Sequence, residues 1–89
     1  MPEIVRQPEA QRFVLLDQAK EIGHLDYQLH DMTMDITHTH VDAAYQGQGL
    51  ARHLVEAAMA AAEQAGWAMR ASCDYAERIL VKAGHLSDH

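Results

Sequence analysis

The feature that most constrains the fold is a glycine-rich stretch that joins an extended segment to an alanine-rich one. Residues 34–41 form an extended, β-branched segment, Gly47 and Gly49 follow, and the alanine-rich segment runs from Leu50 to Ala65. A glycine turn that leads from a strand into a helix presents main-chain N–H groups at the helix start, where the peptide dipoles favour an anion. Glycine also lets the ligand approach the backbone closely. The stretch therefore predicts a phosphate- or pyrophosphate-binding turn, and a glycine turn without a ligand is the alternative.

Two common phosphate-binding loops do not fit this stretch. A Walker loop needs Lys-Ser or Lys-Thr after its last glycine, and neither pair is present. The dinucleotide fingerprint would need Gly or Ala at the position of Arg52, inside a parallel βαβ unit. The pattern that does fit is Gln-x-x-Gly-x-Ala, supplied by Gln46, Gly49 and Ala51.

The first half of the chain is predicted to be strands. Four segments have strand-like composition, at residues 4–7, 12–16, 21–29 and 32–41. Their connections are short, which predicts an antiparallel meander. Gly23 is a candidate bulge position in the third strand.

The alanine-rich segment is predicted to be a helix over residues 50–65. Its small and apolar residues recur at helical spacing, at Leu50, Leu54, Ala57, Ala58, Ala61 and Ala65. The alanines favour helix and let it lie close to a sheet. Gly66 stands where a left-handed C-cap belongs.

A further strand and helix complete the expected order. Residues 67–71 form a fifth strand, parallel to the fourth because a helix crosses over between them. Asp74 and Glu77 have the spacing of a capping box with Asp74 as the N-cap. We therefore expect a second helix over residues 75–83, ended by Gly84. The order ββββ-α-β-α defines an α+β fold.

Composition indicates one small globular domain over residues 1–89 and excludes several classes of protein. Seven basic against 13 acidic residues give a net charge of −6, which argues against nucleic-acid binding. No apolar run is long enough to span a bilayer, and the start Met-Pro-Glu-Ile does not have the pattern of a signal peptide. A single cysteine suits a reducing compartment. We expect a soluble cytoplasmic protein with no membrane partner.

The element order and three motifs together resemble the GNAT N-acetyltransferase superfamily. The glycine stretch resembles its acyl-CoA pyrophosphate loop, and residues 38–41, 46–51 and 72–75 resemble motifs of its short, single-domain, YjdJ-type group. Asp42, where a proline is common, and His40, where Glu or Tyr is common, depart from that pattern. The resemblance implies an acetyl-CoA-dependent N-acetyltransferase whose acceptor is a small-molecule or protein amine. The alternative is an acyl-CoA-binding module without turnover, and a homodimer that completes the acceptor site stays open.

The resemblance also implies where the cofactor binds. The pyrophosphate would lie on the N–H groups from Gly47 to Arg52, and the pantetheine arm would run between the fourth and fifth strands, which splay apart. The implied cofactor-binding residues are His40, Val41, Gln46, Gly47, Gln48, Gly49, Leu50, Ala51, Arg52 and Tyr75.

Cys73, His38 and His40 are the candidate catalytic residues. Cys73 lies at a predicted helix start, which favours the thiolate. It could act as an acid for the leaving sulfur or as a nucleophile that carries the acetyl group, or could simply be a small buried residue. His38 and His40 share a strand face, and an imidazole suits amine deprotonation, although either could be packed or solvated instead. These three residues could also hold a metal, but no spacing supplies a fourth ligand, so none is predicted.

Overall fold

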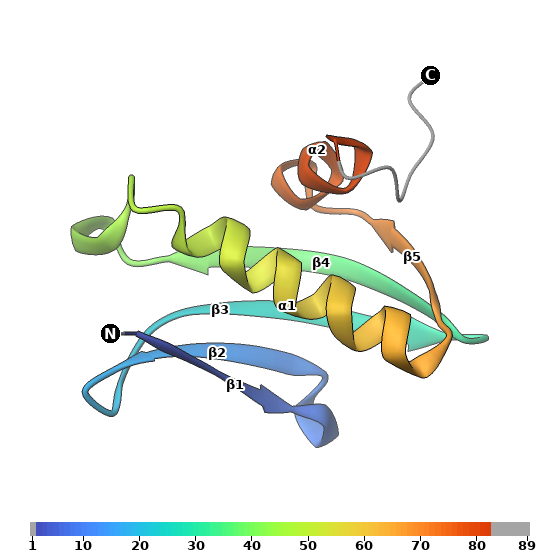
Figure 1. Cartoon of the computed structure of the whole chain (residues 1–89), viewed down its shortest axis with the longest axis horizontal. Helices are drawn as coiled ribbons and strands as arrows, with labels where there is room; N and C mark the ends of the chain where they lie inside the picture. The colour runs from blue at the N-terminus through green and yellow to red at the C-terminus, as the bar shows by residue number, and fades with distance from the viewer. Residues whose placement is uncertain (1, 83–89) are drawn as a thin grey trace.

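The computed structural model describes residues 2–82, which form one mixed sheet and two α-helices (Figure 1). The sheet has five strands in the order β1-β2-β3-β4-β5. The elements in chain order are β1 Glu3–Gln7, the 3-10 helix η1 Pro8–Ala10, β2 Arg12–Asp17, β3 Lys20–His30, β4 Thr33–Val41, the 3-10 helix η2 Ala43–Tyr45, α1 Leu50–Ala65, β5 Ala68–Ala71 and α2 Asp74–Lys82.

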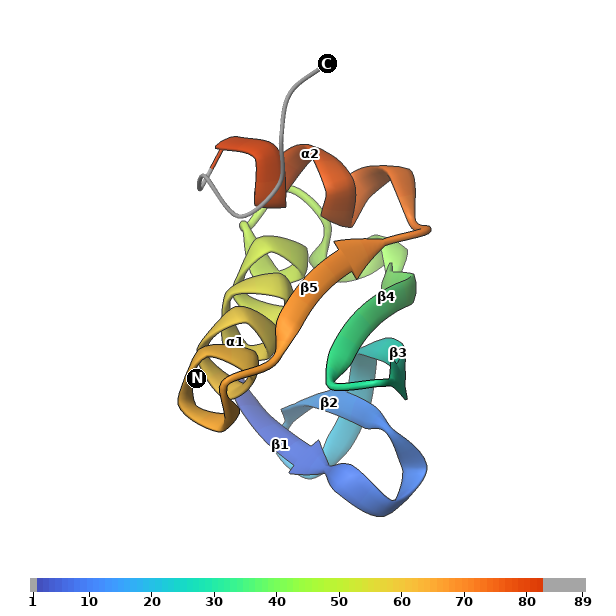
Figure 2. The same ribbon diagram turned by 90° about the vertical axis from the view of Figure 1, so that its right-hand side faces the viewer.

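The pairing of the strands confirms the predicted α+β fold. Strands β1 to β4 are antiparallel neighbours, and β5 runs parallel to β4. The helix α1 crosses over between β4 and β5, and α2 follows directly from the end of β5 (Figure 2). No helix within residues 2–82 has both the length and the apolar composition needed to cross a bilayer.

The two predicted boundaries that follow α1 need small corrections. The strand β5 begins at Ala68, because the amide of Trp67 still bonds to the Ala62 carbonyl of α1 at 2.8 Å. The Glu77 amide donates to the Cys73 carbonyl at 2.9 Å, so Cys73, and not the predicted Asp74, precedes the first turn of α2. The predicted end of this helix at Gly84 lies outside the described residues.

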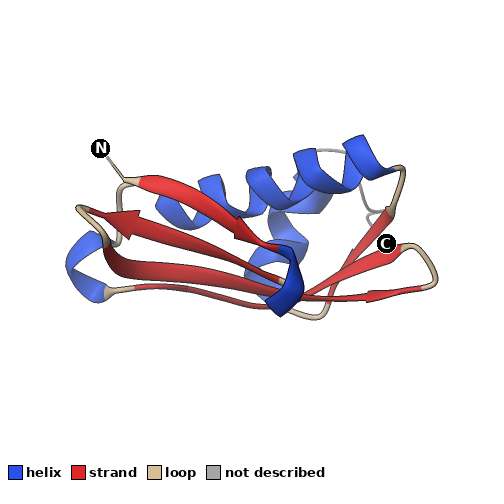
Figure 3. Ribbon diagram, turned by 90° about the horizontal axis from the view of Figure 1, so that it is seen from below, coloured by secondary structure: helices blue, strands red, loops and turns tan. Residues whose placement is uncertain are grey.

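The helix α1 packs on one face of the sheet (Figure 3). Its buried residues are Leu50, Leu54, Val55, Ala58, Ala61 and Ala62. Val55 and Ala62 therefore belong to the packed side, whereas the predicted Ala65 is exposed at the last turn. Gly66 has a φ of 75° and donates to the carbonyls of Ala62 and Glu63, which confirms the predicted C-cap.

A bulge in β4 determines which side chains face α1. Asp26 pairs with His38 whereas Tyr27 pairs with Ile36, so Thr37 is an extra residue in β4. Because side chains alternate along a strand, an extra residue exchanges the two faces. Met34 and Ile36 face the core before the bulge, and Thr39 and Val41 face it afterwards. His38 and His40 consequently lie on the other face of the sheet, which we call the open face.

A second bulge lies beside Gly23 in β3. Leu15 pairs with Gly23 and Leu16 pairs with Glu21, so Ile22 is the extra residue. A Cβ atom on Gly23 would lie 2.7 Å from the main-chain oxygen of His40. Glycine is therefore required at this position by the close approach of β4.

Candidate functional site

The site begins where β4 and β5 separate. Their pairing ends with Ile36 opposite Ala71, and the Ile36 carbonyl then accepts from the amides of Ser72 and Cys73 at 2.9 and 3.1 Å. The Ser72 hydroxyl also bonds to both carboxylate oxygens of Asp35, at 3.0 and 3.1 Å. These bonds turn the chain away from β4 and into α2, so residues 37–41 of β4 have no partner on β5 (Figure 1).

A cavity of about 530 Å³ lies at this separation. Its walls come from the end of β4, the turn before α1, the first turn of α1 and the first turn of α2. The lining residues are Thr39, His40, Val41, Tyr45, Gln46, Gly47, Gly49, Leu50, Ala51 and Tyr75. Eight of the ten residues predicted to bind the cofactor thus line this cavity. The other two, Gln48 and Arg52, do not line it.

The turn before α1 is held in a shape that leaves main-chain donors available. The side-chain amide of Gln46 donates to the Val41 carbonyl at 3.0 Å and ties the turn to the end of β4. Gly47 and Gly49 have φ values of 85° and 75°, in the left-handed region that favours glycine. Gly49 is the N-cap of α1, and no side chain caps this end. Because the first N–H groups of a helix lack partners within it, this end suits an anionic ligand.

A second hollow, of about 310 Å³, lies between α1 and α2. It is lined by Arg52, Tyr75, Arg78 and Ile79, so Tyr75 borders both hollows. Arg52 bonds to Glu56 through Nε at 3.3 Å on an exposed surface. Arg78 did not stand out in the sequence, although its place three residues after Tyr75 puts both on one side of a helix.

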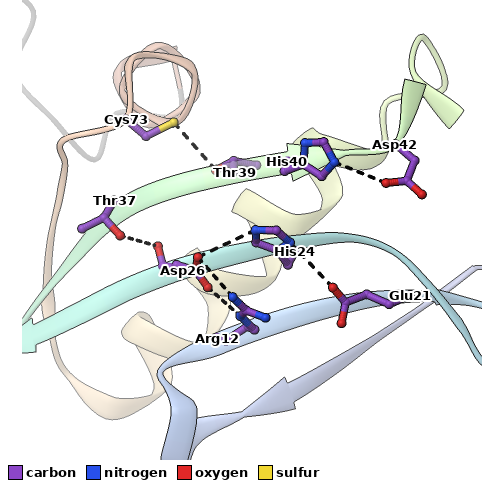
Figure 4. A network of polar contacts seen from close by, with 9 residues as sticks. All are labelled: Arg12, Glu21, His24, Asp26, Thr37, Thr39, His40, Asp42 and Cys73. Carbon is purple, nitrogen blue, oxygen red and sulfur yellow. Dashed lines mark hydrogen bonds and ion pairs between the residues drawn. The ribbon is translucent and has the colours of Figure 1, made fainter. Parts of the chain in front are cut away.

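Cys73 lies at the start of α2, next to β4. Its thiol lies 3.9 Å from the Thr39 hydroxyl, within the looser limit for a sulfur donor (Figure 4). The side chain is a half-buried free thiol that packs against the core. Cys73 does not itself line the cavity, but its neighbour Thr39 does. The cysteine is therefore adjacent to the cavity wall, at the N-terminus of a helix.

His38 and His40 share the open face, and a third histidine lies beside both. The ring of His24, from β3, has its centroid 5.5 Å from that of His38 and 5.6 Å from that of His40. Of these three, His40 alone lines the cavity, and its Nε2 lies 3.2 Å from Asp42 Oδ1. We call His24, His38 and His40 the histidine cluster.

The surroundings of His24 make its proton easier to lose. Burial lowers the pKa of His24 below its ordinary value, the nearby Asp26 opposes this, and Arg12 and His38 add to the lowering. Asp26 is itself engaged by Arg12, whose Nε lies 2.7 Å from Asp26 Oδ1 (Figure 4). Nothing in the sequence singled out His24, because it is 14 residues from His38 and only the pairing register brings them together.

The histidine cluster is not arranged as a metal site. Among residues 2–82, no three His, Cys, Asp or Glu side chains are positioned to hold one ion. The three side chains considered as metal ligands, His38, His40 and Cys73, are not brought together, because the bulge puts both imidazoles on the open face while Cys73 lies beside Thr39 and packs against the core.

Comparisons with known proteins agree with this architecture. The family model of the GCN5-related N-acetyl-transferases matches residues 12–89. A GCN5-like protein from Staphylococcus aureus, solved by NMR, has a TM-score of 0.73 and 25% identity, and the match covers 98% of this chain and 92% of that one. No curated protein matches this chain by sequence.

Larger acetyltransferases share the fold over part of their length. The ribosomal-protein-S18-alanine N-acetyltransferase of Escherichia coli has a TM-score of 0.72 and 24% identity, over 89% of this chain and 54% of that one. The N-acetylglutamate synthase of Neisseria gonorrhoeae, solved with coenzyme A and N-acetyl-glutamate, has a TM-score of 0.64 and 15% identity, over 79% of this chain and 19% of that one. With its family model matched from residue 12 to residue 89, this chain belongs to the GCN5-related N-acetyltransferases.

Proposed function

We propose that this protein transfers an acetyl group from acetyl-CoA to an amine. The observation that carries the proposal is the cavity between the separated ends of β4 and β5, with the uncapped start of α1 in its wall. Membership of the GCN5-related family supports it, as does the coenzyme A in the gonococcal enzyme of the same fold. Acetyl-CoA would supply the acyl group as an activated thioester.

The main chain at the start of α1 is suited to the pyrophosphate. Gly47 and Gly49 have left-handed conformations, no side chain caps the start of α1, and its first turn carries no acidic side chain that would repel a phosphate. Arg52 and Arg78 line the second hollow and would add positive charge next to this site. In this proposal Gln46 has a structural role, because its side-chain amide is used by the Val41 carbonyl.

The unpaired edge of β4 is suited to the pantetheine arm and the acyl carbonyl. The Val41 carbonyl faces this edge, because it accepts from Gln46, and alternate residues of a strand direct their main-chain groups to the same edge. The amides of Thr39 and Val41 are therefore directed toward the cavity side. One preorganised donor to an oxyanion is worth about 2.7–4 kcal/mol of barrier in a comparable site.

Cys73, His38 and His40 would then handle protons or the acyl group. The Cys73 thiol, beside Thr39 in the cavity wall, would protonate the leaving sulfur or act as the nucleophile that carries the acetyl group. His38 and His40 lie on the open face, from which an acceptor amine can reach the edge of β4, and would take up its proton.

A non-catalytic acyl-CoA-binding module is the second candidate. It is favoured by the open face, on which His38 and His40 are exposed, so that an acceptor site there would be shallow. Such a module would bind coenzyme A through the same cavity and would lack efficient turnover.

Calorimetry and thiol release distinguish these outcomes. We expect saturable heat on titration with coenzyme A, and release of free thiol from acetyl-CoA when candidate amines are added. Binding without thiol release above the uncatalysed rate would favour the module. No heat and no saturation with folded protein would remove both candidates.

A further inference from the structure

Thr39 connects the Cys73 thiol to the cavity. After the bulge, Thr39 lies on the face of β4 that is turned toward the core, and Cys73 packs against the same core. The thiol donates to the Thr39 hydroxyl, with 3.9 Å between Sγ and Oγ1 (Figure 4). Thr39 lines the cavity, whereas Cys73 does not. Thr39 therefore contacts both the thiol and the cavity.

A hydroxyl in this position can pass a proton on, because its oxygen accepts one hydrogen bond while its own proton is donated elsewhere. Within residues 2–82, the Thr39 hydroxyl donates to no other protein group, whereas that of Thr37 donates to the Asp26 carbonyl at 3.3 Å. Both Cys73 and the leaving group of acetyl-CoA are thiols, so a proton moved between them passes between groups of similar acidity. The thiolate left on Cys73 would lie at the start of α2, where the helix dipole favours a negative charge.

We propose that Thr39 is a catalytic residue that passes the proton of Cys73 to the departing sulfur of coenzyme A. The inference rests on the proposed function, since it names the group through which the acid of that reaction acts. Thr39 gives its hydroxyl proton to the sulfur as the carbon–sulfur bond breaks and the electron pair stays on sulfur. In the same step Thr39 takes the thiol proton of Cys73. Cys73 is left as a thiolate, regains a proton from water, and forms no bond to the acetyl group.

The bond between thiol and hydroxyl can be tested without any cofactor. Cys73 is the only cysteine in the chain, so its S–H stretching band in the infrared spectrum is assigned directly. Thr39→Val, which keeps a β-branched side chain suited to a strand, should move this band to the higher frequency of an unbonded thiol. Thr39→Ser should keep the wild-type frequency, and so should the matched control Thr37→Val, whose hydroxyl bonds to Asp26. The same frequency in wild type and Thr39→Val would overturn the proposal.

The second experiment measures thiol release from acetyl-CoA in the presence of an amine. Thr39→Val should slow transfer by about 100-fold, as expected for Cys73→Ala, and should keep the affinity for coenzyme A within about twofold. The double variant should be no slower than either single variant, because residues that act as a unit have non-additive effects. Thr39→Ser should retain most of the wild-type rate, since it keeps the hydroxyl.

Two results would separate this proposal from the proposed function. A wild-type rate in Thr39→Val, or effects of the two substitutions that multiply in the double variant, would overturn the role of Thr39 and leave the acetyltransferase in place. Absence of thiol release by wild-type protein that binds coenzyme A would refute the acetyltransferase, and the role of Thr39 with it.

Discussion

The two halves of β4 differ in how many neighbouring strands they pair with. Residues 33–36 pair with β3 on one side and β5 on the other, and Met34 and Ile36 are fully buried. Residues 38–41 pair with β3 alone, and their other edge borders the cavity. Thr37, the bulge residue, separates the two halves. We therefore expect stability to be concentrated where the strand has two neighbours, and ligand access where it has only one.

The largest expected effect is on stability, in the first half of β4. Ile36 is 0% exposed, so Ile36→Ala should lower the free energy of unfolding by about 2–5 kcal/mol, through lost burial and a residual cavity. Thr39→Ala, on the same face beyond the bulge, should cost less than about 1 kcal/mol. Urea titrations followed by circular dichroism measure both. Equal losses would contradict the division between the halves.

The next largest effect is on cofactor binding at the second half. Gly49→Glu should weaken coenzyme A binding by about 10²–10³-fold, because an added side chain and a like charge meet the phosphates and cost several kcal/mol. Gly66→Glu is the matched control, since Gly66 has the same φ of 75° and also leaves open space for a Cβ, but caps the far end of α1. Titration calorimetry should find affinity retained in the control. An equal loss in both variants would indicate backbone strain in place of a binding role.

A smaller effect is expected at the junction between β5 and α2. Cys73→Ala should leave coenzyme A affinity unchanged and slow transfer by about 100-fold, the lower limit of what proton transfer by a positioned group contributes. Steady-state thiol release measures this. Cys73→Ser, which keeps a hydroxyl proton but is a poorer nucleophile, separates the two roles proposed for Cys73. Unchanged turnover in Cys73→Ala would leave the thiol a purely structural packing role against the core.

The smallest expected effect is a pH dependence of the folding stability, caused by His24 on the open face. The pKa of His24 is lowered in the folded protein, so the unfolded chain binds more protons as the pH falls below about 6.5. The contribution of His24 to stability is therefore fully present above that pH and is lost as the pH falls through the folded value. Urea midpoints at pH 7.5 and 5.5 should differ less in His24→Gln than in wild type. The same difference in both proteins would show that His24 does not carry the effect.

The order of elements could be predicted because each signal is local. Alanine spacing predicted α1 to the residue, and Gly66 predicted its end. The glycine turn was found in the same way, since Gly47 and Gly49 need only their neighbours to be interpreted. The N-cap of α2 was misplaced by one residue because Asp74 has the better capping side chain, whereas the main-chain bond of Glu77 to Cys73 defines the boundary.

The arrangement of side chains on the open face could not be predicted, because it depends on pairing between strands. Neither the extra residue at Thr37 nor the register of His24 opposite His40 has a sequence signature. Arg78 was missed for a related reason, since its importance comes from the packing of α2 beside α1. Local sequence patterns thus predicted the helices, the strands and the glycine turn. The charged side chains around the site, such as His24 and Arg78, are brought there by contacts between elements far apart in the sequence.

Because of the bulge at Thr37, the faces that residues 38–41 take depend on the number of residues in β4 more than on their identity. Removing that one residue would turn the last four positions of β4 over, so that two imidazoles would point inward at α1 and a threonine and a valine would point outward. A point substitution at Thr37 should leave this geometry intact, whereas deletion of the residue should invert it. We therefore expect this part of β4 to tolerate substitutions better than deletions.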